Sequence, residues 1–420
     1  MTDTPQILDS EGSPNRLVRA FKKTFQSLMN RNYRLFFLGQ IISNTGNWLT
    51  NVALTLLVLK ITGSGLAVGV LSACQFGPIL FLSAFGGAIA DRYDKRLMLL
   101  LSQSLEMLQS IGLAILAFMP HPPIGWLYVL AAAGGILLSL DNPLRRSFVT
   151  EMVPAEDLPN AVVLYSTIVN VSRIFGPALA GLLVVTLGYG WCFTIDAASY
   201  LVVLFCIYKM RPQELYRQPG KPQTRVDVRE GLRYAMSQPC LWISLVMLAA
   251  IGMLSFNFNV TLPLLVTGAL HSNYGFFTVL YSIFGLGAVI SGLLVANRNL
   301  VRLRHIIFGA VCLGLTMLLL GLVPGVGLAV PAIFLVGMSS VLYMTATTAI
   351  VQVGTRRDMH GRLLALQTML MLGTTLIGGP ISGWLADLIN TRAPIIFGGI
   401  VCLVSAAFGY LTARKYALKP

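Results

Sequence analysis

The sequence predicts an all-α fold, that of a polytopic membrane protein with twelve transmembrane helices in two six-helix bundles. Three observations carry this prediction. First, 55% of the 420 residues are hydrophobic and only 11% are charged, whereas about a quarter of the residues in soluble domains are charged. Second, twelve apolar runs are each long enough to cross a bilayer. Third, the basic residues collect in every second loop. A soluble fold is therefore excluded.

The apolar runs fall into two sets separated by a polar linker. In chain order they cover approximately residues 34–60, 65–90, 97–119, 124–146, 160–187, 190–210, 240–267, 273–297, 305–323, 327–353, 362–388 and 393–413. In the linker, Pro212, Pro219 and Pro222 interrupt helices, while Arg225 to Met236 predicts a short surface helix. The expected domains are a cytoplasmic N-terminal segment, a first bundle, a cytoplasmic linker, a second bundle and a cytoplasmic tail, over residues 1–33, 34–210, 211–239, 240–413 and 414–420.

The Lys and Arg residues predict the orientation. Of the 30, only Lys60 and Arg392 fall in loops on the outer side, and Arg173 falls inside a span. Loops rich in Lys and Arg remain in the cytoplasm, so both termini are expected there and the bilayer is the cell inner (plasma) membrane. The formal charge of +14 then reflects loop topology. Since the basic residues do not cluster on a soluble face, no nucleic-acid partner is expected.

Motifs for enzyme chemistry are missing from the sequence. It contains no Gly-x-x-x-x-Gly-Lys-Ser/Thr phosphate loop, and its four histidines and six cysteines lie far apart. We therefore expect no enzyme, no metal site and no other cofactor. The energy for any transport must come from an ion gradient or from the substrate.

A short charged turn separates the second and third spans and reads Gly87-x-x-x-Asp91-Arg92-x-x-x-Arg96. This spacing resembles the signature loop of major facilitator superfamily transporters, although Asp94 stands where that pattern usually has glycine. The resemblance implies two pseudo-symmetric bundles, alternating access, and gating roles for these four residues, with the basic ones reaching across to the other half.

Further motifs resemble one branch of that superfamily, the macrolide-efflux and enterobactin-exporter-like drug:proton antiporters. They occur in the order expected for the branch and are Asp141-Asn142-Pro143-Leu144-Arg145, Val153-Pro154, Arg173-Ile174-Phe175-Gly176-Pro177 and His360-Gly361-Arg362. The resemblance makes the Gly176-Pro177 bend a gating element, whereas ordinary close packing of a kinked helix is the alternative. Asp141 and Arg145 have the spacing of a helix-surface ion pair, with Pro143 expected to kink or end the helix between them, and we interpret Arg145 as part of a cytoplasmic gate.

Ionisable residues inside the predicted spans are candidates for proton coupling. Glu106 lies near the middle of the third span, Asp141 near the inner end of the fourth and Arg173 near the middle of the fifth. A carboxylate buried in hydrocarbon is more easily protonated than one in water, and Glu106 or Asp141 is the expected partner of Arg173. The alternative is a permanent ion pair that only locks helices together.

A polar face on the first span predicts a substrate cavity. Asn44, Asn47, Trp48 and Asn51 fall at i, i+3, i+4 and i+7, on one side of a helix. Such a face either lines a water-accessible cavity or bonds neighbouring helices, and the family arrangement favours the cavity. Asn257 in the seventh span and Tyr343 in the tenth occupy corresponding places in the second half, where Tyr343 is alternatively a packed aromatic residue. These six residues are the candidate substrate contacts.

The function expected from these features is secondary active export of small amphipathic molecules by proton antiport. Drugs such as macrolides, with multidrug resistance as the outcome, or siderophores would suit an apolar, aromatic cavity, and a monomer is expected to suffice. Alternatives are an importer or lysophospholipid flippase of the same fold, or a receptor or scaffold that transports nothing. The sequence leaves open the cargo, the direction, the coupling ion and which carboxylate titrates.

Overall fold

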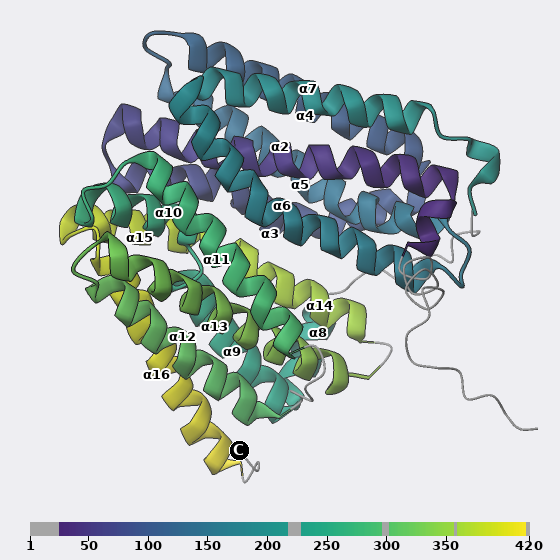
Figure 1. The fold of residues 1–420 in the computed structure, drawn as a ribbon. Helices are drawn as coiled ribbons and strands as arrows, with labels where there is room; N and C mark the ends of the chain where they lie inside the picture. Colours follow the sequence, from purple (N-terminus) through teal and green to yellow (C-terminus); the bar gives the residue numbers. More distant parts are fainter. Residues whose placement is uncertain (1–24, 217–227, 296–301, 357–358, 417–420) are drawn as a thin grey trace, which may run out of the picture.

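The structure, a computed structural model, describes residues 25–216, 228–295, 302–356 and 359–416, without the side chains of residues 83–92, 228, 229 and 360. The described part is helical and contains no strand, so the expected all-α fold is confirmed (Figure 1). The helices form two groups, α2 to α7 and α9 to α16, which occupy the upper and lower parts of Figure 1.

The first group contains six long helices. Their bounds are α2 Arg31–Thr62, α3 Gly65–Arg92, α4 Lys95–Phe118, α5 Ile124–Met152, α6 Leu158–Thr186 and α7 Tyr189–Tyr208, with short 3-10 turns at Gln26–Met29 and Pro212–Glu214. Of the two outcomes expected at Pro143, an end of the helix is wrong, because α5 runs through it to Met152, and a kink there stays a prediction. Membrane helices tolerate an internal proline where neighbouring side chains satisfy the freed backbone groups.

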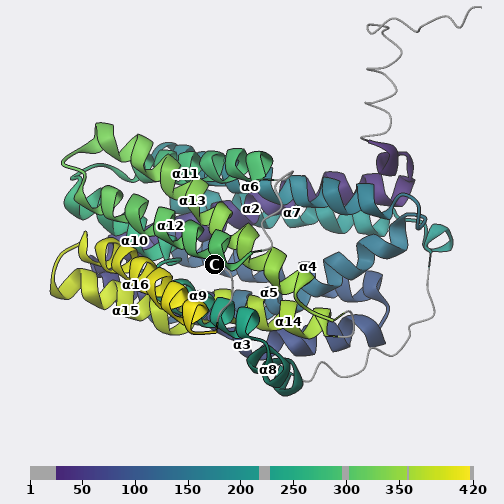
Figure 2. The same ribbon diagram turned by 90° about the horizontal axis from the view of Figure 1, so that it is seen from below.

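The second group contains six spans, two of which are interrupted. Its helices are α8 Val228–Ser237, α9 Pro239–Leu254, α10 Phe258–Leu264, α11 Tyr274–Val295, α12 Leu303–Leu322, α13 Val326–Val353, α14 His360–Thr368, α15 Thr375–Leu388 and α16 Ala393–Lys415. The seventh span joins α9, α10 and the π-helical turn Leu265–Ala269; the eleventh joins α14, the π-helical turn Met369–Gly373 and α15. The short helix predicted in the linker is α8, which lies at the lower edge of Figure 2 and packs on α14.

Eleven helices of the described part are long and apolar enough to cross a membrane. The 32-residue helix α2 is not among them, although it packs between α6 and α7 in the place of a twelfth span. Its asparagine, glutamine and threonine residues lower its mean hydropathy, and several of them face the interior. The expected twelve spans are therefore consistent with the structure.

The two groups meet through two pairs of helices, α3 with α15 and α6 with α11. Small residues allow these close approaches: a Cβ atom at Gly69 would meet the backbone of Gly379, and one at Gly181 would meet the side chain of Thr278. We call the end of the molecule with these contacts the closed end. Toward the end where α2 begins, the two groups diverge (Figure 1), and Val163 on α6 is 63% exposed. We call this the open end.

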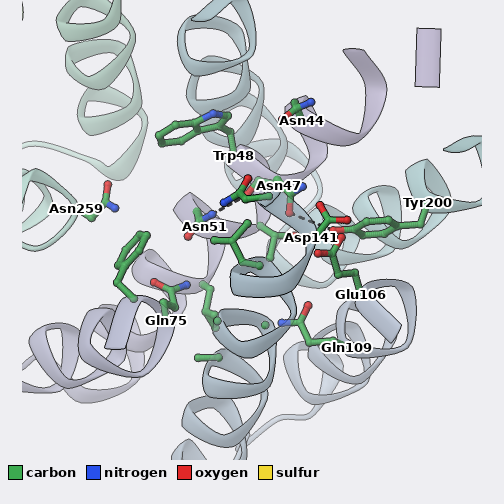
Figure 3. A pocket seen from close by; sticks show the side chains of 18 of the residues that line it. Asn44, Asn47, Trp48, Asn51, Gln75, Glu106, Gln109, Asp141, Tyr200 and Asn259 are labelled. Atoms are coloured by element: carbon green, nitrogen blue, oxygen red, sulfur yellow. Dashed lines mark hydrogen bonds between the residues drawn. The ribbon is translucent and has the colours of Figure 1, made fainter. Parts of the chain in front are cut away.

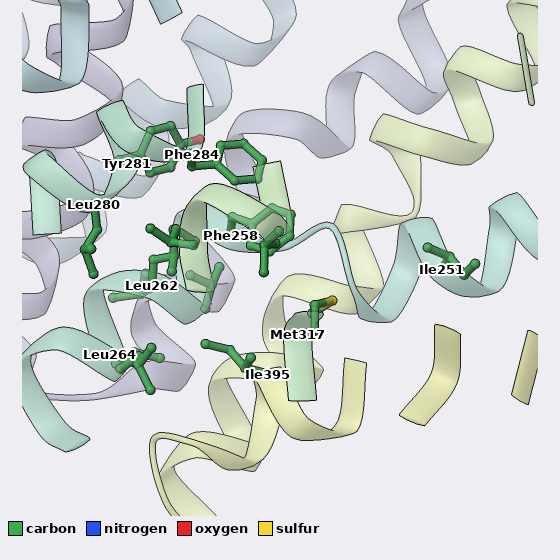
Figure 4. Close-up of a cluster of buried hydrophobic side chains, with 14 of the residues drawn as sticks. Ile251, Phe258, Leu262, Leu264, Leu280, Tyr281, Phe284, Met317 and Ile395 are labelled. Atoms are coloured by element: carbon green, nitrogen blue, oxygen red, sulfur yellow. The ribbon is translucent and has the colours of Figure 1, made fainter. Parts of the chain in front are cut away.

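Buried apolar side chains fill both groups. In the second group Phe258, Leu262 and Phe284 pack in one cluster (Figure 4), beside the break between α9 and α10. Polar groups stabilise that break: Asn257 donates to the carbonyl of Met253 at 2.6 Å, within the same span, and Ser255 donates to that of Gly398 on α16 at 2.8 Å. Irregular backbone at membrane depth is found where it lines a cavity or is buried in protein.

Candidate functional site

Two adjoining cavities lie between the two groups of helices. The first has a volume of about 250 Å³ and is lined mainly by the first group, and the second has about 520 Å³ and is lined mainly by the second group. Trp48, Phe76, Asn142 and Asn259 line both. Together the volumes fall within the range of roughly 300–1,000 Å³ that is usual for small-molecule sites.

The polar face predicted on α2 lines the first cavity. Asn44, Asn47, Trp48 and Asn51 all line it, together with Asn259 of the other group, which lies on the side of Trp48 and Asn51 (Figure 3). Asn47 also accepts a hydrogen bond from the Tyr200 hydroxyl at 3.1 Å. The face thus both borders space between the halves and bonds a neighbouring helix.

The two candidates in the second group differ. Asn257 is 2% exposed and lines the second cavity. Tyr343 is fully buried, contributes to neither cavity, and its ring centre lies 6.3 Å from that of Phe256. The expectation that Tyr343 contacts substrate is therefore corrected to the alternative, a packed aromatic residue, because α13 turns this side chain into the core.

A buried charge cluster lies on the wall of the first cavity. Arg145 forms an ion pair with Asp141 on the same helix and a second, at 3.5 Å, with Glu106 on α4. Its guanidinium also donates to Gln40 on α2 at 2.6 Å. All four of these residues are at most 5% exposed. Arg145 thus ties three helices together and pairs with two carboxylates.

Gln103 extends this cluster. Its amide nitrogen donates to Asp141 at 2.9 Å and to Glu106 at 3.0 Å, so that it bridges the two carboxylates. Its amide oxygen is buried and has no hydrogen-bond partner among the described residues. A proton on either carboxylate would add a hydrogen-bond donor to this cluster.

The expected pairing of Arg173 with Glu106 or Asp141 is wrong, because Arg145 occupies both carboxylates. Arg173 instead lies with its guanidinium carbon 5.8 Å from the centre of the Trp48 ring and lines the second cavity. No carboxylate of the described residues is within ion-pair distance of it.

A further buried carboxylate, Asp196 on α7, was not predicted. It is 1% exposed and accepts hydrogen bonds from Thr50 on α2 and Ser110 on α4, both at 2.7 Å. The signal was present in the sequence, because Asp196 is the one acidic residue within the predicted span 190–210. Its three-helix contact points to a structural role beside the cavity.

Comparison with known proteins identifies the family. A family model described as transmembrane secretion effector matches residues 22–416. The chain belongs to this family of major facilitator superfamily transporters. It is therefore a multi-pass membrane transporter and not an enzyme.

Curated relatives agree with this assignment. The staphyloferrin A transporter of Staphylococcus aureus (strain NCTC 8325 / PS 47) is 23% identical over 396 residues, which are 92% of this chain and 97% of the relative. The enterobactin exporter EntS of Shigella flexneri is 26% identical over 386 residues, which are 89% of each chain.

Solved structures share the fold at low sequence identity. A bacterial homolog of the human lysosomal transporter Spinster, in an inward-facing and unoccupied conformation, has a TM-score of 0.72 at 15% identity and covers 92% of this chain and 98% of its own. The POT family transporter PepTSo has a TM-score of 0.78 at 13% identity, with 93% and 99% covered.

The signature loop of this major facilitator transporter is described only in part. The side chains of Gly87, Asp91 and Arg92 lie outside the described residues, and their backbone belongs to α3. The family resemblance implied that Arg96 reaches across to the other half, and the structure shows that it does not. It donates to the carbonyls of Ile207 at 3.1 Å and Tyr208 at 3.0 Å, at the end of α7 in its own half, because cations stabilise helix C-termini.

The Gly176-Pro177 element lies inside α6, which continues through it. Gly176 faces Trp48 and the backbone of Thr45, so a Cβ atom there would collide with α2. The glycine therefore brings α6 against the cavity-lining face of α2.

Among the described residues, no group of three His, Cys, Asp or Glu side chains is placed to hold a metal ion.

Proposed function

We propose that this transporter exports a small amphipathic molecule of the siderophore type by proton antiport through alternating access. The observation that carries the proposal is the buried cluster of Arg145, Glu106 and Asp141 on the wall of a cavity between two helix groups that are closed at one end. The names of two relatives, a staphyloferrin A transporter and an enterobactin exporter, support the siderophore class. Macrolides are the second cargo class to be tested.

In this proposal the protein lies in the cell inner (plasma) membrane. The open end and both termini face the cytoplasm, because the basic loops lie at that end. One chain supplies both walls of the cavities, so a monomer suffices. The described conformation then receives cargo from the inside, and movement of the halves about the closed end would expose it to the outside.

The charge balance of the cluster suggests how protons couple to this movement. With both carboxylates ionised the cluster carries one net negative charge, and with one protonated it is neutral. Glu106 is the proposed proton carrier, because its contact with Arg145 is the longer of the two ion pairs. Protonation from the outside would weaken the attraction between Glu106 and Arg145 and leave Arg145 paired with Asp141. Loss of the proton inside would restore the cluster and prepare the cavity for cargo.

Inverted membrane vesicles test the proposal. With the vesicle interior acidified and a quenched dye reporting the gradient, addition of purified siderophores should release protons and restore fluorescence, and vesicles without the protein should not respond. Glu106→Gln should abolish this proton movement while labelled cargo still exchanges down its own gradient. Glu156→Gln, the same substitution at an exposed loop position, is the matched control.

Proton movement that persists in Glu106→Gln would rule out this carrier. Accumulation of labelled cargo without any proton movement would contradict proton antiport and favour sodium coupling. Uptake in place of extrusion, or movement of lysophospholipid alone, would assign the chain to the importer or flippase alternative.

A further inference from the structure

The second cavity contains a positive charge that has no countercharge among the described residues. Arg173 is half-buried on its wall, and no Asp or Glu is found among the residues that line it. The acidic residues of the neighbouring cavity, Glu106 and Asp141, are held by Arg145. An arginine cannot be neutralised by losing its proton, so a partly desolvated guanidinium at this depth favours an anionic partner.

The wall around Arg173 is aromatic. It contains Trp48, Phe76, Phe256, Phe258, Tyr281 and Phe284. Ring centres of Phe258 and Phe284 are 4.9 Å apart, and Tyr281 lies beside them (Figure 4). Flat, rigid rings of this kind present a large apolar area with little loss of conformational entropy when a ligand binds.

Polar groups on the same wall are few and favour a ligand with oxygen atoms. Tyr281 donates its hydroxyl to the side-chain oxygen of Asn259 at 2.6 Å, which leaves the Asn259 amide nitrogen as a donor. Asn257 has a side-chain oxygen without a partner among the described residues and can accept from a hydroxyl or N–H group. Few polar groups in an apolar, aromatic cavity are the usual means of orienting a small ligand.

We propose that the second cavity selects cargo that carries an anionic group, bound by Arg173, next to a flat aromatic or apolar part, bound by the aromatic wall. This inference rests on the proposed transport function and specifies the charge of the cargo. Cationic amphipathic drugs are then poor ligands, because they would place a positive charge near Arg173. A guanidinium binds a carboxylate through two parallel hydrogen bonds, which Lys cannot reproduce.

Arg173 could instead serve only as packing for Trp48, through the cation–π contact between them. The two roles predict different ligand preferences. In the packing role the charge of a ligand is irrelevant to its affinity, whereas in the binding role affinity follows ligand charge and depends on Arg173.

Three dansyl probes with one fluorophore and different charges separate these roles. We would measure the binding of dansylglycine (anionic), dansylamide (neutral) and dansylcadaverine (cationic) to the purified full chain in lipid nanodiscs, through energy transfer from tryptophan. Dansylglycine should bind at least about tenfold more tightly than dansylamide, as expected for hydrogen bonds to a charged group. Dansylcadaverine should bind most weakly.

Arg173→Gln should weaken dansylglycine by roughly tenfold or more and leave dansylamide within about twofold. Arg173→Lys should retain part of the preference, and unchanged dansylamide binding shows that each variant is folded. If Arg173→Gln does not fold, the wild-type probe series and Arg173→Lys still decide. Equal affinities of the wild type for dansylglycine and dansylamide, no binding of any probe, or equal weakening of both by Arg173→Gln would overturn the inference.

These binding measurements require no proton gradient and no net transport. Charge-selective binding with no proton-coupled export would refute the proposed function and leave the cavity assignment standing. Proton-coupled export with charge-indifferent binding would do the reverse.

Discussion

The carboxylate of Asp387, near the end of α15, accepts a hydrogen bond of 2.7 Å from the backbone N–H of Gly65 in the first turn of α3, 322 residues away in the chain. It also accepts from the N–H of Leu66 at 2.9 Å and from the hydroxyl of Ser64 at 2.7 Å. A carboxylate at a helix N-terminus satisfies free N–H groups and interacts favourably with the helix dipole. Because α3 and α15 belong to different halves, this cap holds the closed end together.

Asp387→Ala is expected to shift the conformational equilibrium toward conformations in which the two halves have separated at the closed end. The loss of a helix cap costs about 0.5–2 kcal/mol, which corresponds to roughly a 2- to 30-fold change in the ratio of the two states. Spin labels at Gly125 and Gly327, where an added side chain meets no neighbouring atom, would report the distance across the closed end by pulsed electron resonance. Asp387→Asn, which keeps an acceptor, should give a smaller shift.

Asn273→Ala is the matched control, because Asn273 accepts a hydrogen bond of 2.9 Å from the N–H of Phe276 within the second half alone. It removes a cap at the same end without crossing between the halves and should leave the distance distribution unchanged. An identical response of the two variants would show that the Asp387 cap stabilises α3 without linking the halves.

Removal of Arg145 should strongly destabilise the fold. Arg145→Met would leave Glu106 and Asp141 buried close to each other without a cation, and breaking a buried ion pair in this way costs about 3–5 kcal/mol. Thermal unfolding of the purified protein in detergent measures the effect. The triple variant Arg145→Met, Glu106→Gln, Asp141→Asn should recover most of the lost stability, because it no longer buries charge. A triple variant as unstable as the single one would show that Arg145 acts through packing and its bond to Gln40.

Asp196 should matter for stability through the three helices that it joins. Asp196→Ala leaves the hydroxyls of Thr50 and Ser110 without the acceptor that they share. Hydrogen bonds to charged groups contribute about 1.5–3 kcal/mol each, so we expect a clear fall in the unfolding temperature. Asp196→Asn keeps one acceptor oxygen and should lower the unfolding temperature less. The cycle with Thr50→Val checks the pairing: additive effects of the two substitutions would contradict a direct interaction.

Local patterns of the sequence predicted the helices and part of the site, and contacts between distant helices were beyond them. Apolar length and the placement of Lys and Arg were enough for the spans, and helical periodicity placed Asn44 and Asn51 on one cavity-lining face. The pair of Asp141 and Arg145 followed from their spacing of four residues. Such signals depend only on the helix that contains them.

The errors concern relations between helices. Whether Glu106 pairs with Arg145 or Arg173 depends on how α4, α5 and α6 are rotated about their axes, which no single-helix pattern specifies. The contact of Asp387 with Gly65 likewise depends on how the two halves meet. The break between α9 and α10 was missed because no Gly or Pro marks residues 255–257.

Transport should depend on the close contact between α6 and α11. Gly181 on α6 packs against the side chain of Thr278 on α11, with no space for a Cβ atom. Gly181→Val would force the two halves apart, and overpacking of this kind costs about 1–3 kcal/mol. We expect a longer distance between labels at Gly125 and Gly327 and a loss of gradient-driven transport, since the halves could no longer close at this end.

Thr278→Gly, which removes the colliding atoms, should restore part of the activity when combined with Gly181→Val. Gly325→Ala adds a side chain at the same end where nothing lies within contact distance and should transport normally. If Gly181→Val transports as well as Gly325→Ala, closure at this point is not required in the transport cycle.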